Sequence, residues 1–552
     1  MTLAKSLWDK VFLSLLAAVL LLLCTRIIAP DSFSGWSFGD TQTLLSLKQW
    51  DKGGWKENKF LFAPQGYSSF APLLDTPPLA QHAHGVSPHT SPSVGPRRLY
   101  THYPSGYLFP YAFFHSFGGV QSAHGLQLVS IIISLLGAAL FYAALKKVLP
   151  ESAAFAAAAF YVLSPAFADY SYSLANQPLD DMLRWLFVFL IIANKDDSPR
   201  LYAAAWGAQL ALSLCSFDSV LFVFCFLLGW DALRREFSLK KYALFALAPL
   251  LAHGLQFAQN SWYLGLHSAW RDAADTFFSR SRHDTALLAK IADAFNPYLS
   301  AYAPVSLAVF AAAAAAYLYF ARRETRSLAV LLLLCGLPMP LLLPGANFSY
   351  QVRQLLPFIS VCAGLMIVEA VSGLLRLARE KRYYPGGAAA VSCGVAAVWL
   401  LAQNAAALFA PPAAAYPVMP SDITLAKAIK DMPAAHEKTV FNIDGFATYQ
   451  EYDYVPGYPQ ICPEVEYYSG GTLVLSFTKP QDLARDLAFI RRNAGAEFSP
   501  ILVARDISKL DAVLQSLESY RAEKGGFSGV PQPRKAGDAY IVDLTPLAEQ
   551  LK

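Results

Sequence analysis

Long apolar runs separated by short polar segments make up the first three quarters of the chain. Eleven of these runs approach the roughly 20 residues that a helix needs to cross a bilayer. They cover residues 9–29, 125–145, 152–171, 179–194, 201–217, 218–233, 242–262, 301–321, 327–346, 353–375 and 387–409. Pro338, Pro340 and Pro344 fall in the ninth run, which is therefore predicted to be kinked or broken. The pattern predicts a mainly α, polytopic transmembrane helical bundle.

Two segments lack this pattern. Residues 30–122 form a long loop after the first run, and residues 410–552 form a charged tail after a Pro-rich junction. The tail alternates strand-like runs with amphipathic helical runs, which predicts a small C-terminal α/β domain. The predicted strands are 439–444, 472–477, 500–506 and 540–544, and the predicted helices are 481–493 and 508–519. We therefore expect a membrane domain at 1–409 and a soluble domain at 410–552.

Composition narrows the class of protein. Charged residues are 15% of the chain and hydrophobic residues 55%, against roughly 25% charged in an average soluble protein. So much apolar surface excludes intrinsic disorder. A net charge of +4 is too small to indicate nucleic acid as a partner. The seven cysteines contain no CxxC metal pair and give no disulfide framework.

The distribution of basic residues predicts the orientation. If the N-terminus is cytoplasmic, the short cytoplasmic loops hold clusters such as Lys146-Lys147 and Arg234-Arg235, while the short outer loops hold only Arg353. Basic residues favour the cytoplasmic side. With eleven spans, the tail then lies outside. This predicts a multi-pass bacterial inner-membrane protein with a periplasmic or extracellular C-terminal domain.

Carboxylates mark the first two outer loops. Asp40 precedes an amphipathic run, residues 41–50, that is typical of a helix on the membrane surface. An N-cap role would by itself account for Asp40. Asp180 and Asp181 begin the fourth span, where the helix dipole favours negative charge. Capping explains one aspartate better than two, because adjacent carboxylates repel unless a cation or donor is near. Asp169 is a further candidate.

Aromatic and basic side chains fill the rest of the outer loops. Residues 97–119, "RRLYTHYPSGYLFPYAFFHSFGG", suit either a membrane interface or a carbohydrate site. Tyr103, Tyr107 and His102 are the candidates for contact with the sugar or acceptor. The histidine-rich segment "QHAHGVSPHT" lacks a metal-ligand spacing, so no metal site is assigned. Guanidinium groups can bind a lipid phosphate or anchor the loops. The candidate arginines are Arg97, Arg98, Arg271, Arg280, Arg282 and Arg353.

Four motifs together resemble the integral-membrane glycosyltransferases of the GT-C superfamily, of the protein-mannosyltransferase, aminoarabinose-transferase and Rgt-like type. They are "GDTQTLLSLKQW", "YPSGYLFPYAFFHSFGG", "LSPAFADYSYSLANQPLDDMLRWLFVFLI" and "NFSYQVRQLLPFIS", and the resemblance covers most of residues 1–375. The chain departs from the family where Asp40 is followed by Thr41 rather than by a second acidic residue. The tail also lacks a WWD-type oligosaccharyltransferase motif.

The resemblance implies a polyprenyl-phosphate-linked sugar as donor and a glycan, lipid or protein acceptor at the outer face of the bilayer. Asp40 would act as general base in an inverting transfer. Asp180 or Asp181 would orient the base or the acceptor, and the outer arginines would stabilise the departing phosphate. No cofactor is required; the scheme is compatible with a divalent metal but does not need one, because arginines can stabilise the phosphate. Neither a Walker nor a GxGxxG loop occurs.

Three alternatives stay open. A surface-polysaccharide polymerase or ligase would share the lipid-linked donor. A lipid or solute transporter without catalysis would need ionisable residues at mid-membrane, and the spans offer mainly His253 and Glu369. A membrane scaffold would simply display the tail.

Overall fold

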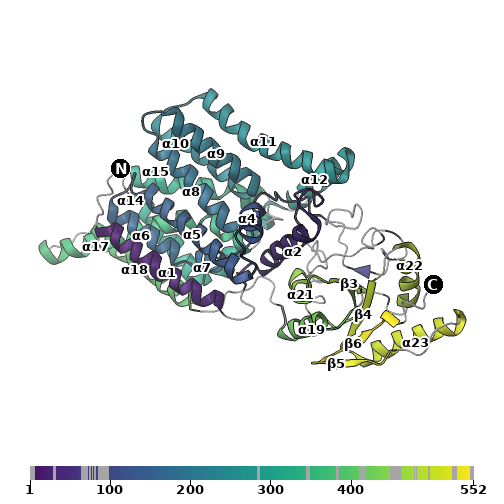
Figure 1. The fold of residues 1–552 in the computed structure, drawn as a ribbon. Helices are drawn as coiled ribbons and strands as arrows, with labels where there is room; N and C mark the ends of the chain where they lie inside the picture. Colours follow the sequence, from purple (N-terminus) through teal and green to yellow (C-terminus); the bar gives the residue numbers. More distant parts are fainter. Residues whose placement is uncertain are drawn as a thin grey trace. The chain divides into compact units, whose positions relative to one another are not determined.

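The computed structural model of the chain is mainly helical (Figure 1). It describes residues 7–28, 33–63, 73, 76, 79, 83–84, 99–281, 286–321, 323–342, 349–380, 385–409, 418–434, 436–447, 462–477, 479, 482–494, 498–524 and 531–546. The chain forms two compact units. The first comprises Met1–Trp36, Pro104–Phe257 and Phe277–Ala415, and the second comprises Ser37–Tyr103, Ala258–Thr276 and Tyr416–Lys552. The unit that holds the tail thus includes residues 37–103 and 258–276 as well, and the division at residue 410 stays a prediction.

In the described part of the chain, which leaves out residues 343–346 of the ninth span with Pro344, a helix or helix pair corresponds to each of the eleven predicted spans. In chain order these are α1 (Leu7–Ile28), α5 (Ala123–Leu145), α6 (Glu151–Val162) with α7 (Pro165–Tyr170), α8 (Gln177–Ala193), α9 (Pro199–Cys215), α10 (Asp218–Arg234), α11 (Leu239–Leu264), α14 (Pro304–Phe320), α15 (Arg323–Gly336) with α16 (Pro338–Leu342), α17 (Leu356–Glu380) and α18 (Pro385–Ala407). The ninth span is interrupted before Pro338, where a proline was predicted to break it.

Five helices in the described part of the chain are long and apolar enough to cross a membrane. They are α1, α5, α17, most of α18, and α15 taken together with α16. A sixth candidate is the pair α13 (Leu287–Ala301) and α14, which is bent by 110°. The apolar helices agree with a multi-pass membrane protein, while the count of eleven stays a prediction.

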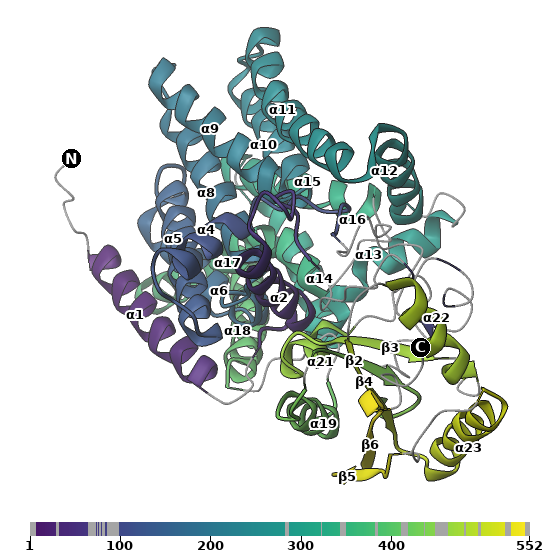
Figure 2. The ribbon, with the colours of Figure 1, turned by 45° about the vertical axis from the view of Figure 1, so that its right-hand side comes forward.

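Small residues let the helices of the first unit approach one another closely. Helix α17 packs against α6 and α18, and α5 packs against α8 (Figures 1 and 2). A Cβ placed on Gly364 of α17 would lie 2.4 Å from the backbone nitrogen of Ala157 in α6. Without a hydrophobic driving force between helices in lipid, such backbone proximity supplies the van der Waals contact that holds a bundle together.

The second unit contains a six-stranded sheet of order β1-β3-β2-β4-β6-β5. The strands are β1 (Ala83–His84), β2 (Glu437–Asn442), β3 (Leu473–Phe477), β4 (Phe498–Ala504), β5 (Arg534–Ala536) and β6 (Ala539–Asp543). Strand β2 pairs in parallel with β3 and β4, and β1 adds antiparallel to β3. The four strands predicted in the tail are therefore found as β2, β3, β4 and β6. The sequence indicated neither β5 nor β1, which comes from the loop after the first helix.

Helices complete the second unit. In chain order they are α2 (Ser37–Gly53), the part of α12 (Leu266–Ser281) up to Thr276, α19 (Pro420–Lys430), α21 (Pro463–Tyr468), α22 (Leu483–Ala494) and α23 (Ile507–Lys524). Leu487 and Ile490 of α22 and Val513 of α23 are buried in one apolar core with Phe441 and Leu502 of the sheet. The two amphipathic helices predicted in the tail are α22 and α23.

Candidate functional site

Asp40 lies inside α2 rather than at its cap. The helix begins at Ser37, so Asp40 is its fourth residue, and its side chain is fully buried. The predicted N-cap position is therefore wrong, because the three preceding residues already adopt helical conformation.

A second carboxyl group, Glu464, is buried near Asp40. Helix α21 packs against α2, and the Ser37 hydroxyl donates a hydrogen bond to Oε1 of Glu464 at 2.9 Å. Burial raises the pKa of Glu464 to about 7, and the negative charge of Asp40 contributes in the same direction. The Cys462 thiol donates to Oε2 at 3.6 Å. Asp40 thus has an acidic neighbour from the tail, which no motif in the sequence had indicated.

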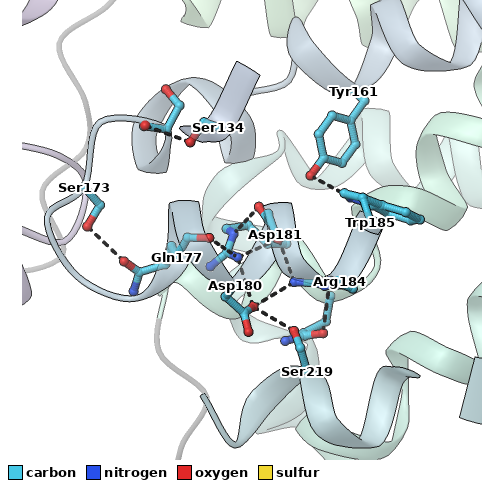
Figure 3. Close-up of polar contacts among 12 residues, drawn as sticks. Ser134, Tyr161, Ser173, Gln177, Asp180, Asp181, Arg184, Trp185 and Ser219 are labelled. Atoms are coloured by element: carbon cyan, nitrogen blue, oxygen red, sulfur yellow. Dashed lines mark hydrogen bonds and ion pairs between the residues drawn. The ribbon is translucent and has the colours of Figure 1, made fainter. Parts of the chain in front are cut away.

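Asp180 and Asp181 form a buried charge cluster with Arg184 and Arg353, called here the tetrad. Figure 3 shows Asp180, Asp181 and Arg184. Arg184 Nη2 lies 3.0 Å from Asp180 Oδ2 and 2.6 Å from Asp181 Oδ1. Arg353 Nη2 lies 3.3 Å and 2.6 Å from the same two oxygens. Two positive and two negative side chains therefore balance one another, as a buried group of charges requires.

The helices place the tetrad through local geometry. Asp180, Asp181 and Arg184 share one face of the first turns of α8 at the i, i+3 and i, i+4 spacings. The short helix η3 (Ser349–Gln354) contributes Arg353, which also donates to the carbonyl of Gln177 at 2.9 Å. Ser219 of α10 donates to Asp180 Oδ2 at 2.7 Å (Figure 3). The side chain of Asp181 is 13% exposed, whereas the other three charged side chains are at most 4% exposed.

The predicted arginines differ in their contacts and in their exposure to solvent. Arg353 contacts the predicted aspartates, whereas Arg271 is 79% exposed and lies 3.7 Å from Asp275. Arg280 lies on α12. Arg97, Arg98 and Arg282 fall outside the described residues. Arg184, which was not among the predicted site residues, is a second cation that contacts both aspartates.

His102 has a carboxylate partner in the second unit. Its Nε2 lies 2.7 Å from Oδ1 of Asp272, and both side chains are largely buried. Tyr103, beside it, is half-buried. Tyr107 belongs to the first unit and is buried just before α4 (Leu108–Ser116). The three residues predicted to contact sugar or acceptor therefore fall in two units, and the His102 and Asp272 pair was not foreseen.

Asp169 forms an ion pair with Arg26 of α1, with 2.9 Å between Oδ1 and Nη1. The same guanidinium donates to the carbonyl of Leu408.

In the described part of the chain, no group of three or more His, Cys, Asp or Glu side chains is arranged to hold a metal ion. Of the histidines in "QHAHGVSPHT", only His84 is described, as part of β1.

No family model and no curated protein sequence matches the chain. Among solved structures it is similar to the oligosaccharyltransferase of Archaeoglobus fulgidus. For the crystal structure tethered to an acceptor peptide containing the NVT sequon, the TM-score is 0.46 at 13% identity, covering 95% of this chain and 73% of that one. For the same archaeal enzyme, AglB, in complex with an inhibitory peptide and a dolichol-phosphate, the TM-score is 0.46 at 11% identity, with the same coverage. At these values the likeness assigns neither a family nor a reaction.

Proposed function

We propose that the chain is an integral-membrane glycosyltransferase that moves a monosaccharide from a polyprenyl-phosphate donor to a glycan, lipid or protein acceptor at the outer face of the membrane. The burial of Asp40 carries the proposal. The burial of Asp40 argues against the simplest alternative, in which its side chain faces water and caps the helix. A buried titratable group near a second carboxyl group, here Glu464, is also typical of a functional site. The motif order around Asp40, Asp180 and Asp181 supplies the reaction class.

The reaction would be one inverting displacement. An acceptor hydroxyl gives its proton to the Asp40 carboxylate while its oxygen forms a bond to the anomeric carbon of the donor. The bond between that carbon and the phosphate oxygen breaks, and the polyprenyl phosphate leaves with the electron pair. Outer arginines stabilise the charge that develops on the phosphate. The apolar helices would lie in the bilayer, so the prenyl chain of the donor would stay among the lipids throughout the reaction.

The tetrad would hold the outer end of α8 and the η3 segment in one arrangement. Its charges cancel, and three of its side chains are almost fully buried. Asp181 is the member with an exposed edge, so it is the one that would orient the acceptor. No cofactor is required by this scheme, and full activity in excess EDTA would agree with that expectation.

The test uses the full-length protein in detergent micelles with undecaprenyl phosphate carrying mannose, glucose, galactose or aminoarabinose. Release of undecaprenyl phosphate is measured with and without an envelope extract as the acceptor source. Asp40→Asn should lower the rate about 10²- to 10⁴-fold, the typical contribution of a positioned acid or base. Asp51→Asn, on the exposed end of the same helix, is the matched control.

Three results would overturn parts of the proposal. Full activity of Asp40→Asn would remove Asp40 as the base. Movement of the lipid across vesicles without release of undecaprenyl phosphate would indicate a transporter. For orientation, a reporter fused after Lys552 should be active only outside the cytoplasm, and cytoplasmic activity would show that the tail lies inside.

A further inference from the structure

His102 and Asp272 form a fixed pair within the second unit. Helix α12 contributes Asp272, and the segment just before α4 contributes His102. Besides the 2.7 Å contact with His102 Nε2, Asp272 accepts a hydrogen bond from the Thr101 hydroxyl at 2.5 Å through its other oxygen. The carboxylate therefore receives one donor on each oxygen, an arrangement that fixes its plane.

The residues around the pair are also held in place. Asn260 donates to the backbone carbonyl of Thr101 at 2.9 Å. The backbone amide of Leu99 donates to the Tyr263 hydroxyl at 3.2 Å. The imidazole ring of His102 lies 5.1 Å from the ring of Tyr100. With its side chain only 9% exposed, His102 is thus confined to one orientation.

The pairing decides which imidazole nitrogen is left for a ligand. A carboxylate at Nε2 requires that nitrogen to carry the proton, so neutral His102 keeps a lone pair on Nδ1. No described residue forms a hydrogen bond with Nδ1. A carboxylate that fixes one imidazole nitrogen while the other faces a substrate is the arrangement by which proteins orient a functional histidine.

We propose that Asp272 is a positioning residue that orients His102 so that Nδ1 accepts a hydrogen bond from a sugar hydroxyl. The identity of the ligand as a sugar rests on the proposed function. The inference adds a hydroxyl-recognition subsite in the second unit, with Asp272 as a required residue outside the motifs. His102 acts there by binding, and Asp40 remains the base.

Two substitutions of His102 separate binding from structure. Asparagine places a side-chain oxygen near the position of Nδ1, whereas glutamine places its amide near the position of Nε2. If Nδ1 binds a sugar hydroxyl, His102→Asn keeps that contact and His102→Gln loses it. A purely structural pairing with Asp272 gives the opposite ranking. Asp272→Asn should resemble His102→Gln, since it removes the group that sets the tautomer.

The measurements are KM and kcat for release of undecaprenyl phosphate, and binding of methyl glycosides of the same four sugars by saturation-transfer NMR. Loss of one hydrogen bond is worth about 0.5–1.5 kcal/mol, or about a two- to twelvefold effect. We expect KM to rise by that factor in His102→Gln and Asp272→Asn, with kcat within about twofold. Asp275→Asn, exposed on the same helix, should match the wild type.

Each outcome bears on the proposal separately from the proposed function. If the wild type releases no undecaprenyl phosphate from any donor, the function fails, while glycoside binding by the two His102 variants still tests the subsite. A raised donor KM assigns the hydroxyl to the donor sugar. An unchanged donor KM with lost glycoside binding assigns it to the acceptor. Wild-type behaviour of His102→Gln in both assays, or weaker binding by His102→Asn than by His102→Gln, overturns the inference.

Discussion

Replacing Glu464 with glutamine should stabilise the protein at alkaline pH. Burial raises the pKa of Glu464 to about 7 from its ordinary value of 4.5, since the native state disfavours the charged carboxyl group. Glutamine cannot ionise, and it keeps an oxygen that can accept the hydrogen bond from Ser37. The substitution therefore removes the cost of burying a charge while it preserves the contact between α2 and α21.

The size and the pH window follow from the two pKa values. Below pH 4.5 the carboxyl group is protonated in both the folded and the unfolded chain, so ionisation contributes nothing. Between pH 4.5 and 7 the unfolded chain loses its proton first, and the stability of the wild type falls as the pH rises. At 1.36 kcal/mol per pKa unit, the loss reaches about 3 kcal/mol above pH 7. Glu464→Gln should avoid that loss.

Thermal unfolding of the full-length protein in detergent, followed from pH 5 to pH 8, measures the difference. For a unit of this size, about 3 kcal/mol corresponds to a rise of about 6–12 °C in Tm at pH 8, with little change at pH 5. Glu518→Gln on the exposed face of α23 should follow the wild type at every pH. If Glu464→Gln is no more stable than the wild type at pH 8, the folded protein ionises the Glu464 carboxyl group without a cost in stability. That result would refute the predicted rise in its pKa.

Two further substitutions test the first unit by the same unfolding assay. Arg353→Met should destabilise it by about 3–5 kcal/mol, because it leaves the two buried carboxylates of the tetrad with one cation, Arg184. Arg271→Met, on the surface of the second unit, should change stability by less than about 0.5 kcal/mol. Equal effects of the two would show that the tetrad is not a buried unit of charge. Gly364→Ala should cost about 1–3 kcal/mol, because its Cβ would meet the α6 backbone at 2.4 Å. Gly254→Ala, with no atom within 4 Å of the new Cβ, should be neutral or stabilising, and a similar loss in both would refute the close approach of α17 and α6.

The parts of the fold that depend on local periodicity could be predicted from the sequence. In the described residues, each apolar run of helical length forms a helix or a pair of helices, and the strands around Val440 and Leu502 lie within two residues of their predicted bounds. The adjacency of Asp180 and Asp181 indicated a cation or hydrogen-bond donor nearby, although neither Arg184 nor Arg353 was predicted to be their partner. These inferences needed only residues within a few turns of one another.

The missed features join residues that are distant in the chain. Glu464 meets Ser37 across 427 positions, and Asp272 meets His102 across 170. In the sequence, neither Glu464 nor Asp272 has a spacing or a neighbouring motif that distinguishes it from an ordinary surface carboxylate. The sequence pattern places Asp40 at the N-cap position because it predicts a helix that begins one residue later. That error also concealed its burial, since a residue in the first turn can face the interior.

Strand β1 joins an early segment of the chain to the sheet of the C-terminal segment. Its two residues cover the edge of β3, pairing Ala83 with Phe477 about 400 positions later. An uncovered strand edge is a template for aggregation, and α2 from the same early segment supplies the partner of Glu464. Ribosomal synthesis therefore makes the cover long before the sheet that it protects. Separated from the loop that holds β1 and α2, the C-terminal segment would expose both the end of an open sheet edge and a buried carboxyl group.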